Sequence, residues 1–168
     1  SSNWIAPDRW NGIIYISDTS ANPNASPAPV HRGIRLKNGK VLPTDGITIA
    51  SENPVYIQGD YNTGTGVVPS NAIVNNDPTT PQSPGYTRQP AAVIADAVNI
   101  LSNNWNDTNA QVGDPLSARV ALNTTVNTAI VAGIVPSSLP TGDGSSSGGA
   151  ENFPRFLAVW DGSNVTYF

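Results

Sequence analysis

Residues 45–62 constrain the fold most strongly, because this stretch contains two short aliphatic runs joined by a polar corner. Ile47 and Ile49 alternate with other residues in the first run, and Val55 and Ile57 do so in the second. A period of two places each aliphatic row on one face of a strand. Short strands that meet at bends are typical of a β-solenoid. A meander of hairpins has similar spacing and remains open.

The composition favours many short strands and turns. The chain has 15 glycines and 15 prolines among 168 residues, only 12% of its residues are charged, and its polarity comes from Asn, Ser and Thr. Gly, Pro and Asn each suit turns, whereas an all-helical bundle needs few of them. This length is typical of one domain. We therefore predict a single domain over residues 1–168, mainly β with two short α-helices. A β-solenoid-like sheet of the parallel β-helix type is preferred, and a β-sandwich is the alternative.

Four further segments are predicted as strands. Residues 12–16 form an apolar, β-branched run, and residues 33–37 alternate apolar with basic residues before the turn dipeptide Asn38-Gly39. Residues 119–135 are rich in Thr, Val and Ile, which favours a strand over most of the segment. Residues 164–168 form a closing strand. The Pro- and Gly-rich segments 63–89 and 139–150 are predicted as loops.

Two segments have the pattern of short helices. In residues 90–105, Pro90 suits the first helical position, and the apolar side chains of Ile94, Val98, Leu101 and Trp105 follow a spacing of three to four. This helix is expected to pack on the sheet. The second helix is predicted after Asn152 as N-cap, with Pro154 in the first turn. Its shared apolar face consists of Phe153, Phe156, Leu157 and Trp160.

The charge balance argues against nucleic acid as a partner. The net charge is −4, and phosphate binding requires clustered Lys and Arg. One modest basic cluster is interpreted as a solvated strand edge that discourages pairing between edges; its members are Arg32, Arg35, Lys37 and Lys40.

The absence of two residue types bears on the origin of the chain. Cys and Met are both missing, and the first residue is Ser. We therefore expect a processed or excised part of a longer chain, without a disulfide framework or a thiolate metal site. No apolar run approaches the roughly 18 residues that span a bilayer, so membrane insertion by this segment is not expected.

Candidate catalytic and zinc-binding groups are few. His31 is the single histidine, it lies beside Arg32, and no G-x-S-x-G motif accompanies it, so a Ser-His-Asp triad is not predicted. One His without Cys does not provide the ligands of a zinc site. Paired carboxylates are the remaining route to glycan hydrolysis, with Asp60 beside Tyr61 or Glu52 near Asp45 as candidates. Because Asp beside Gly or Asn is usual in turns, no catalytic or cofactor-binding residue is predicted.

Other polar and aromatic clusters were weighed as binding sites. Calcium would take oxygen ligands from two groups, but neither matches the twelve-residue calcium loop, and Asx turns explain such clusters. The first group is Asp60, Asn62, Asn75, Asn76 and Asp77, and the second is Asn104, Asn106 and Asp107. Glycosylation sequons begin at Asn24, Asn106, Asn123 and Asn164. A sugar-stacking face is possible from the aromatic residues Trp4, Trp10, Tyr56, Tyr61 and Tyr86, although core filling is the usual role of such residues.

Several blocks of the sequence resemble a group of bacterial surface proteins. The blocks are residues 42–50, 53–62, 95–97, 101–107 and 151–157. They resemble the C-terminal regions of large PilX-like proteins associated with type IV pilus assembly. The resemblance covers parts of residues 42–168 and includes no catalytic or ligand motif. It implies an exported, extracellular or cell-surface protein, although this chain contains no prepilin-type apolar helix.

A structural role is the prediction that follows. We expect a non-enzymatic structural or adhesion-type subunit of a cell surface, appendage or filament, which assembles with copies of itself or with neighbouring surface proteins. Unpaired strand edges at the ends of a solenoid would accept another strand. A carbohydrate-binding module with glycan contacts is the first alternative. A carboxylate-dependent glycan hydrolase is the second.

Overall fold

The protein is mainly β, and its strands pair in parallel. The computed structural model describes residues 12–20, 32–66, 86–111, 113–133 and 154–160, and the main chain of 165–167. The strands are β1 (Ile13–Ile16), β2 (Ile34–Lys37), β3 (Ile47–Ser51), β4 (Val55–Gln58), β5 (Ala91–Ala95), β6 (Val98–Leu101), β7 (Thr124–Val126), β8 (Ala129–Ala132), β9 (Arg155–Phe156) and β10 (Val165–Tyr167). Two single 3-10 turns, η1 (Asp107–Asn109) and η2 (Leu116–Arg119), lie between β6 and β7.

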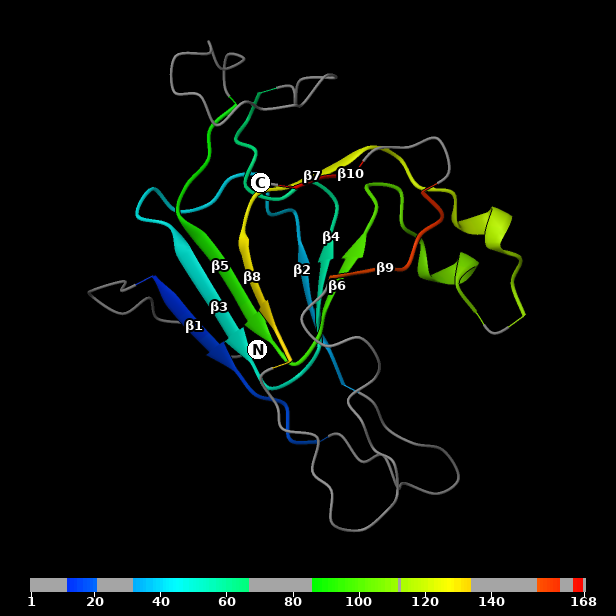
Figure 1. Cartoon of the computed structure of the whole chain (residues 1–168), viewed down its shortest axis with the longest axis horizontal. Coiled ribbons are helices and arrows are strands. Elements are labelled where there is room, and N and C mark those ends of the chain that lie inside the picture. The colour runs from blue at the N-terminus through cyan, green and yellow to red at the C-terminus, as the bar shows by residue number, and fades with distance from the viewer. Residues whose placement is uncertain are drawn as a thin grey trace, which may run out of the picture.

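Strands β1 to β6 alternate between two sheets. One sheet has the order β1-β3-β5-β8 and the other has the order β2-β4-β6-β9 (Figure 1). A third, two-stranded sheet pairs β10 with β7, and Tyr61 forms a parallel bridge to Val126 beside it. Hairpins would have produced antiparallel ladders between consecutive strands. A meander of hairpins is therefore wrong for the described strands.

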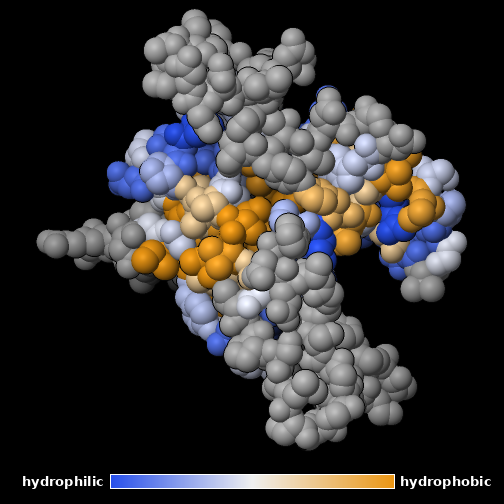
Figure 2. Space-filling model, viewed as in Figure 1, coloured by the Kyte–Doolittle hydropathy of each residue, from blue (hydrophilic) through white to orange (hydrophobic). Residues whose placement is uncertain are grey.

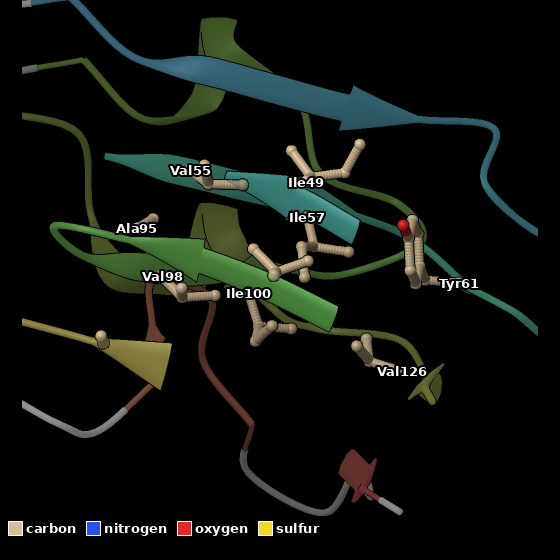
Figure 3. Packing of buried hydrophobic residues seen from close by; sticks show 10 residues of the cluster. Ile49, Val55, Ile57, Tyr61, Ala95, Val98, Ile100 and Val126 are labelled. Carbon is tan, nitrogen blue, oxygen red and sulfur yellow. The ribbon is translucent and has the colours of Figure 1, made fainter. Parts of the chain in front are cut away.

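The core lies between the inner faces of the two larger sheets. Ile49 is aligned with Val93 in the first sheet, and Ile57 with Ile100 in the second. The side chains of Ile49, Ile57 and Ile100 gather between the ribbons (Figure 3), and Ile57 and Ile100 have no exposed surface. Because neighbouring strands are parallel and in register, like residues stack on like, and the aliphatic rows join into one cluster.

The predicted helix over residues 90–105 is wrong. The chain forms β5, bends at Asp96-Ala97 and continues as β6. All four residues of β6 are buried, including the polar Asn99. The bend also changes which residues face inward, so Ile94 and Val98 imitate a helical spacing although they belong to different strands.

The second predicted helix is also wrong in its described part. Residues 154–160 contain the short strand β9, whose Arg155 and Phe156 pair with β6. Phe156 and Trp160 do share a contact, with ring centroids 6.1 Å apart in an edge-to-face arrangement. That aromatic contact occurs in a segment without helical turns. Asn152 and Phe153 lie outside the described residues.

The structure confirms strands in each of the four further segments predicted to contain them. Residues 12–16 and 33–37 contain β1 and β2, and Asn38 begins a turn with φ of 59°. The segment 119–135 contains two strands in different sheets, β7 and β8, rather than one. The closing strand is confirmed as β10. The predicted loop 139–150 and most of the loop 63–89 fall outside the described residues.

Candidate functional site

A polar face is formed by the outward side chains of β2 and β4. The register pairs Arg35 with Tyr56 and Lys37 with Gln58, so these four residues form two adjacent rows. The inward residues of the same strands, such as Ile57, are buried in the core. The alternation in residues 33–37 that predicts a strand therefore also places both basic side chains on this face.

Arg35 links this face to the η1 turn. Its guanidinium donates two hydrogen bonds to Asp107, at 2.7 and 2.9 Å, and Trp105 donates from its indole nitrogen to the same carboxylate at 2.8 Å. Hydrogen bonding to Arg35 and then to Trp105 lowers the pKa of Asp107 to about 2. Gln58 donates to the main-chain oxygen of Trp105 at 3.1 Å. The side chains of β2 and β4 thus hold the start of the η1 turn.

A surface depression of about 260 Å³ lies at the carboxyl ends of β2 and β4. Its lining is entirely polar apart from a glycine, and consists of Lys37, Asn38, Lys40, Gln58, Gly59, Asp60 and Asn103. Lys37, Asn38 and Lys40 are exposed. The depression contains two ammonium groups and one carboxylate, so it carries an excess of one positive charge. The chain as a whole has a net charge of −4.

Asp60 is held in place by three partners. Its Oδ1 accepts hydrogen bonds from Asn103 Nδ2 at 2.8 Å and from the Thr125 main-chain nitrogen at 3.0 Å. Its Oδ2 lies 3.2 Å from the ammonium of Lys40. A carboxylate with these partners connects three parts of the chain, which is a structural role.

A second surface, the apolar face, is formed by the outward side chains of the sheet β1-β3-β5-β8. These side chains alternate with the buried row that contains Ile49 and Val93. By register they are Ile13, Tyr15, Thr48, Ala50, Ala92, Ile94, Ala129 and Val131, none of which is charged. Ile13, Tyr15 and Val131 are 57%, 60% and 48% exposed. Figure 2 shows apolar atoms gathered where β3, β5 and β8 lie in Figure 1.

The structure does not bring the candidate carboxylate pairs together. Asp45 and Glu52 flank the extended strand β3, so their main chains are separated by roughly 20 Å at about 3.3 Å per residue. Glycosidases hold their two carboxyl groups about 5 to 9.5 Å apart. Asp60 is the only carboxylate among the described residues that line the depression. His31 lies outside the described residues.

The proposed calcium ligands are occupied by hydrogen bonds within the protein. Asn104 Oδ1 accepts from Ser102 and from the Leu122 nitrogen, while Asn106 Oδ1 caps η1 through Thr108. Asn62 is buried, and Asn75–Asp77 fall outside the described ranges. Across the described parts of the chain, no group of three His, Cys, Asp or Glu side chains is placed to hold a metal ion.

The candidate aromatic platform does not form as a unit, and two of its tyrosines fill the core as expected. Tyr61 and Tyr86 are buried, at 4% and 3% exposure, and burial raises the pKa of Tyr61 to about 12. Tyr56 is half-buried on the polar face, whereas Trp4 and Trp10 lie outside the described residues. The sequence interpretation placed Lys37 in a solvated strand edge and did not single out Gln58, because only the tertiary structure aligns β2 with β4.

Two of the sequon asparagines are placed by the structure. Asn106 and Asn123 are both exposed, and Asn106 serves as the N-cap of η1. Asn24 and Asn164 are not among the described residues. In the described segments, no helix is long and apolar enough to cross a membrane.

The fold defines a mainly β protein of parallel sheets with one polar and one apolar outer face. No family model, curated protein or solved structure matches the chain. The resemblance to PilX-like pilus-associated proteins therefore stays a prediction.

Proposed function

We propose that this chain is a non-enzymatic, structural or adhesion-type subunit of a cell surface or extracellular appendage, and that it acts by assembling with copies of itself. The observation that carries the proposal is the exposed apolar face of β1-β3-β5-β8. Parallel sheets normally have both faces covered, so an uncovered apolar outer face is a candidate contact surface. The inner face of this sheet is covered by the core, whereas the outer face carries three well-exposed apolar or aromatic side chains, Ile13, Tyr15 and Val131.

We further propose that the strands form a β-solenoid of the parallel β-helix type. Three successive passes of the chain support this proposal. One pass contains β3, β4 and Tyr61, the next contains β5, β6 and β7, and the third contains β8, β9 and β10. Each element pairs with its counterpart in the following pass. Such a stack is a rigid spacer, because each pass is fixed by its neighbours.

The uncharged nature of the apolar face favours a second copy as the partner. Two identical faces without charged side chains meet without repulsion between like charges. By contrast, the edge strand β2 exposes Arg35 and Lys37, and charged side chains discourage pairing at an edge. Lateral contact through the apolar face is therefore favoured over strand addition at β2.

The size of the apolar face indicates a weak contact. Four strands about 4.8 Å apart and about four residues of 3.3 Å each cover roughly 200 Å². A stable interface buries about 800 Å² per partner. Assembly through this face is therefore expected only at high local concentration, as on a crowded surface or along a filament.

Sedimentation velocity over a wide concentration range tests the assembly. We expect the mean mass to rise with concentration for the wild type. The substitution Val131→Asp should abolish the rise, because it places a charge on each of the two meeting faces. Val41→Asp is the matched control, since Val41 is an exposed valine, at 62%, outside the apolar face. A chain that stays monomeric throughout, or equal effects of the two substitutions, would contradict the proposal.

A further inference from the structure

The depression at the carboxyl ends of β2 and β4 is a candidate binding site, because one of its two lysines forms no ion pair within the described parts of the chain. Lys40 pairs with Asp60, whereas no acidic group in the described parts of the chain forms an ion pair with Lys37. The ammonium of Lys37 is therefore the source of the excess positive charge. A surface cation beside a depression is suited to a ligand that carries one negative charge.

Uncharged hydrogen-bonding groups surround that cation. Gln58 lies opposite Lys37 in the register, and the exposed Asn38 follows it at the turn. The Gln58 side-chain nitrogen is used by Trp105, but its oxygen receives only a long contact of 3.5 Å from Arg35. This oxygen can accept a hydrogen bond from a ligand hydroxyl, and the amide of Asn38 provides both donors and an acceptor.

An aromatic ring lies on the same outer face, beyond the residues that line the depression. Tyr56 is two residues before Gln58 on the same strand, so both side chains point to the outer face. A Cβ atom at Gly33 would lie 2.7 Å from the Tyr56 ring, so this side chain lies close to the glycine backbone. The Tyr56 side chain is half-buried, so part of it remains open to solvent. The apolar C–H face of a sugar ring packs on surfaces of this kind.

We propose that this depression binds a carboxylated saccharide. Lys37 pairs with the sugar carboxylate, Gln58 and Asn38 bond to ring hydroxyls, and Tyr56 supports a neighbouring sugar ring. A neutral saccharide would not use the charge of Lys37, and sulfate, which has no hydrogen-bond donor, would not use the acceptor oxygen of Gln58. This binding function goes beyond the assembly role and uses a different face of the molecule.

Isothermal titration calorimetry of the full chain tests the proposal with a trisaccharide of galacturonic acid as the probe. We expect saturable binding that weakens as salt is added, and a loss of at least tenfold in affinity for Lys37→Gln. A trisaccharide of galactose lacks the carboxylates. It should bind the wild type at least tenfold more weakly than the galacturonic acid probe does. Tyr56→Ala is expected to weaken both ligands.

Two controls decide between the proposal and simpler explanations. Arg32→Gln removes the same charge outside the depression and should leave the affinity unchanged; an equal loss would indicate non-specific attraction and overturn the proposal. Sodium sulfate at matched ionic strength should compete no better than sodium chloride. Strong competition by sulfate would identify a simple anion site, and absence of saturable binding by the galacturonic acid probe would reject the site. None of these results depends on whether the chain assembles.

Discussion

Asn62 and Asn127, 65 positions apart, each donate a side-chain hydrogen bond to the main-chain oxygen of the other, at 2.8 and 2.9 Å. Both residues are buried. Asn62 also accepts from the Gln89 nitrogen and donates to the Gln89 oxygen, so its amide satisfies three main-chain groups. Its φ of 58° lies in the left-handed region, which Asn tolerates well. These hydrogen bonds stabilise the corner of the chain where Tyr61 pairs with Val126 of β7.

Removing the Asn62 amide should destabilise the fold strongly. Asn62→Gly keeps the left-handed backbone accessible but removes the side-chain partner of the buried Asn127 oxygen and of two main-chain groups of the half-buried Gln89; a buried group left without a partner costs about 1–3 kcal/mol. We expect the free energy of unfolding to fall by more than about 2 kcal/mol, measured by urea denaturation. Asn38→Gly is the control, because Asn38 has a φ of 59° but is exposed; it should change stability by less than about 0.5 kcal/mol. Similar effects at the two positions would show that backbone conformation alone matters.

The close approach of Pro90 to Gly46 leads to a second prediction. Gly46 has a φ of 84°, and a Cβ there would collide with the main-chain oxygen of Pro90, to which Ile47 donates at 2.9 Å. Gly113 has a φ of 95° but nothing within 4 Å of such an atom. Gly113→Ala should therefore cost only the backbone strain of about 1–2 kcal/mol. Gly46→Ala should cost at least about 2 kcal/mol more, because the β3–β5 ladder must shift. Equal thermal midpoints for the two variants would refute this reasoning.

The parallel register can be tested by a disulfide, because the chain contains no cysteine. Thr48 and Ala92 are direct partners on β3 and β5. Parallel neighbours lie about 4.8 Å apart, within the range of about 4.4–6.8 Å between the Cα atoms of a disulfide. Thr48→Cys combined with Ala92→Cys should cross-link under mild oxidation. Thr48→Cys combined with Ile94→Cys, displaced by two residues, should not. Efficient cross-linking of the displaced pair would contradict the register.

The Arg35–Asp107 ion pair predicts a pH response at acid pH. The folded protein lowers the pKa of Asp107 to about 2. Its contribution to stability is therefore present above the unfolded value of about 3.9 and is lost as the pH falls through about 2. The pair is worth less than about 1 kcal/mol, because Asp107 is largely exposed. The Trp105 indole N–H resonance, followed by NMR, should report an inflection near pH 2.

Arg35→Met supplies the comparison for that titration. Without the guanidinium, the inflection at Trp105 should move up toward the ordinary carboxyl pKa of about 3.9. Lys37→Met removes a smaller electrostatic contribution and should move the inflection less. If Arg35→Met left the inflection in place, Arg35 would not be the cause of the lowered pKa.

Local patterns in the sequence determined the β character of this protein and most of its corners. The period-two rows in β2, β3 and β4 are visible in the sequence because one face of each strand is at least partly open to solvent. Turn residues such as Asn38 and Gly46 carry their own conformational preferences, so their positions follow from residue type. These are short-range effects, and they act in the same way in any tertiary context.

Only the tertiary structure decided the state of residues 90–105 and the composition of both outer faces. Strands β5 and β6 are each third of four in the order of their sheets, and the bend between them joins two strands whose apolar residues together have a helical spacing in the sequence. Pairing across 21 to 65 positions brought Lys37 to Gln58 and Asn62 to Asn127. Parallel neighbours come from distant parts of the chain, so the register is set by packing that no local window contains.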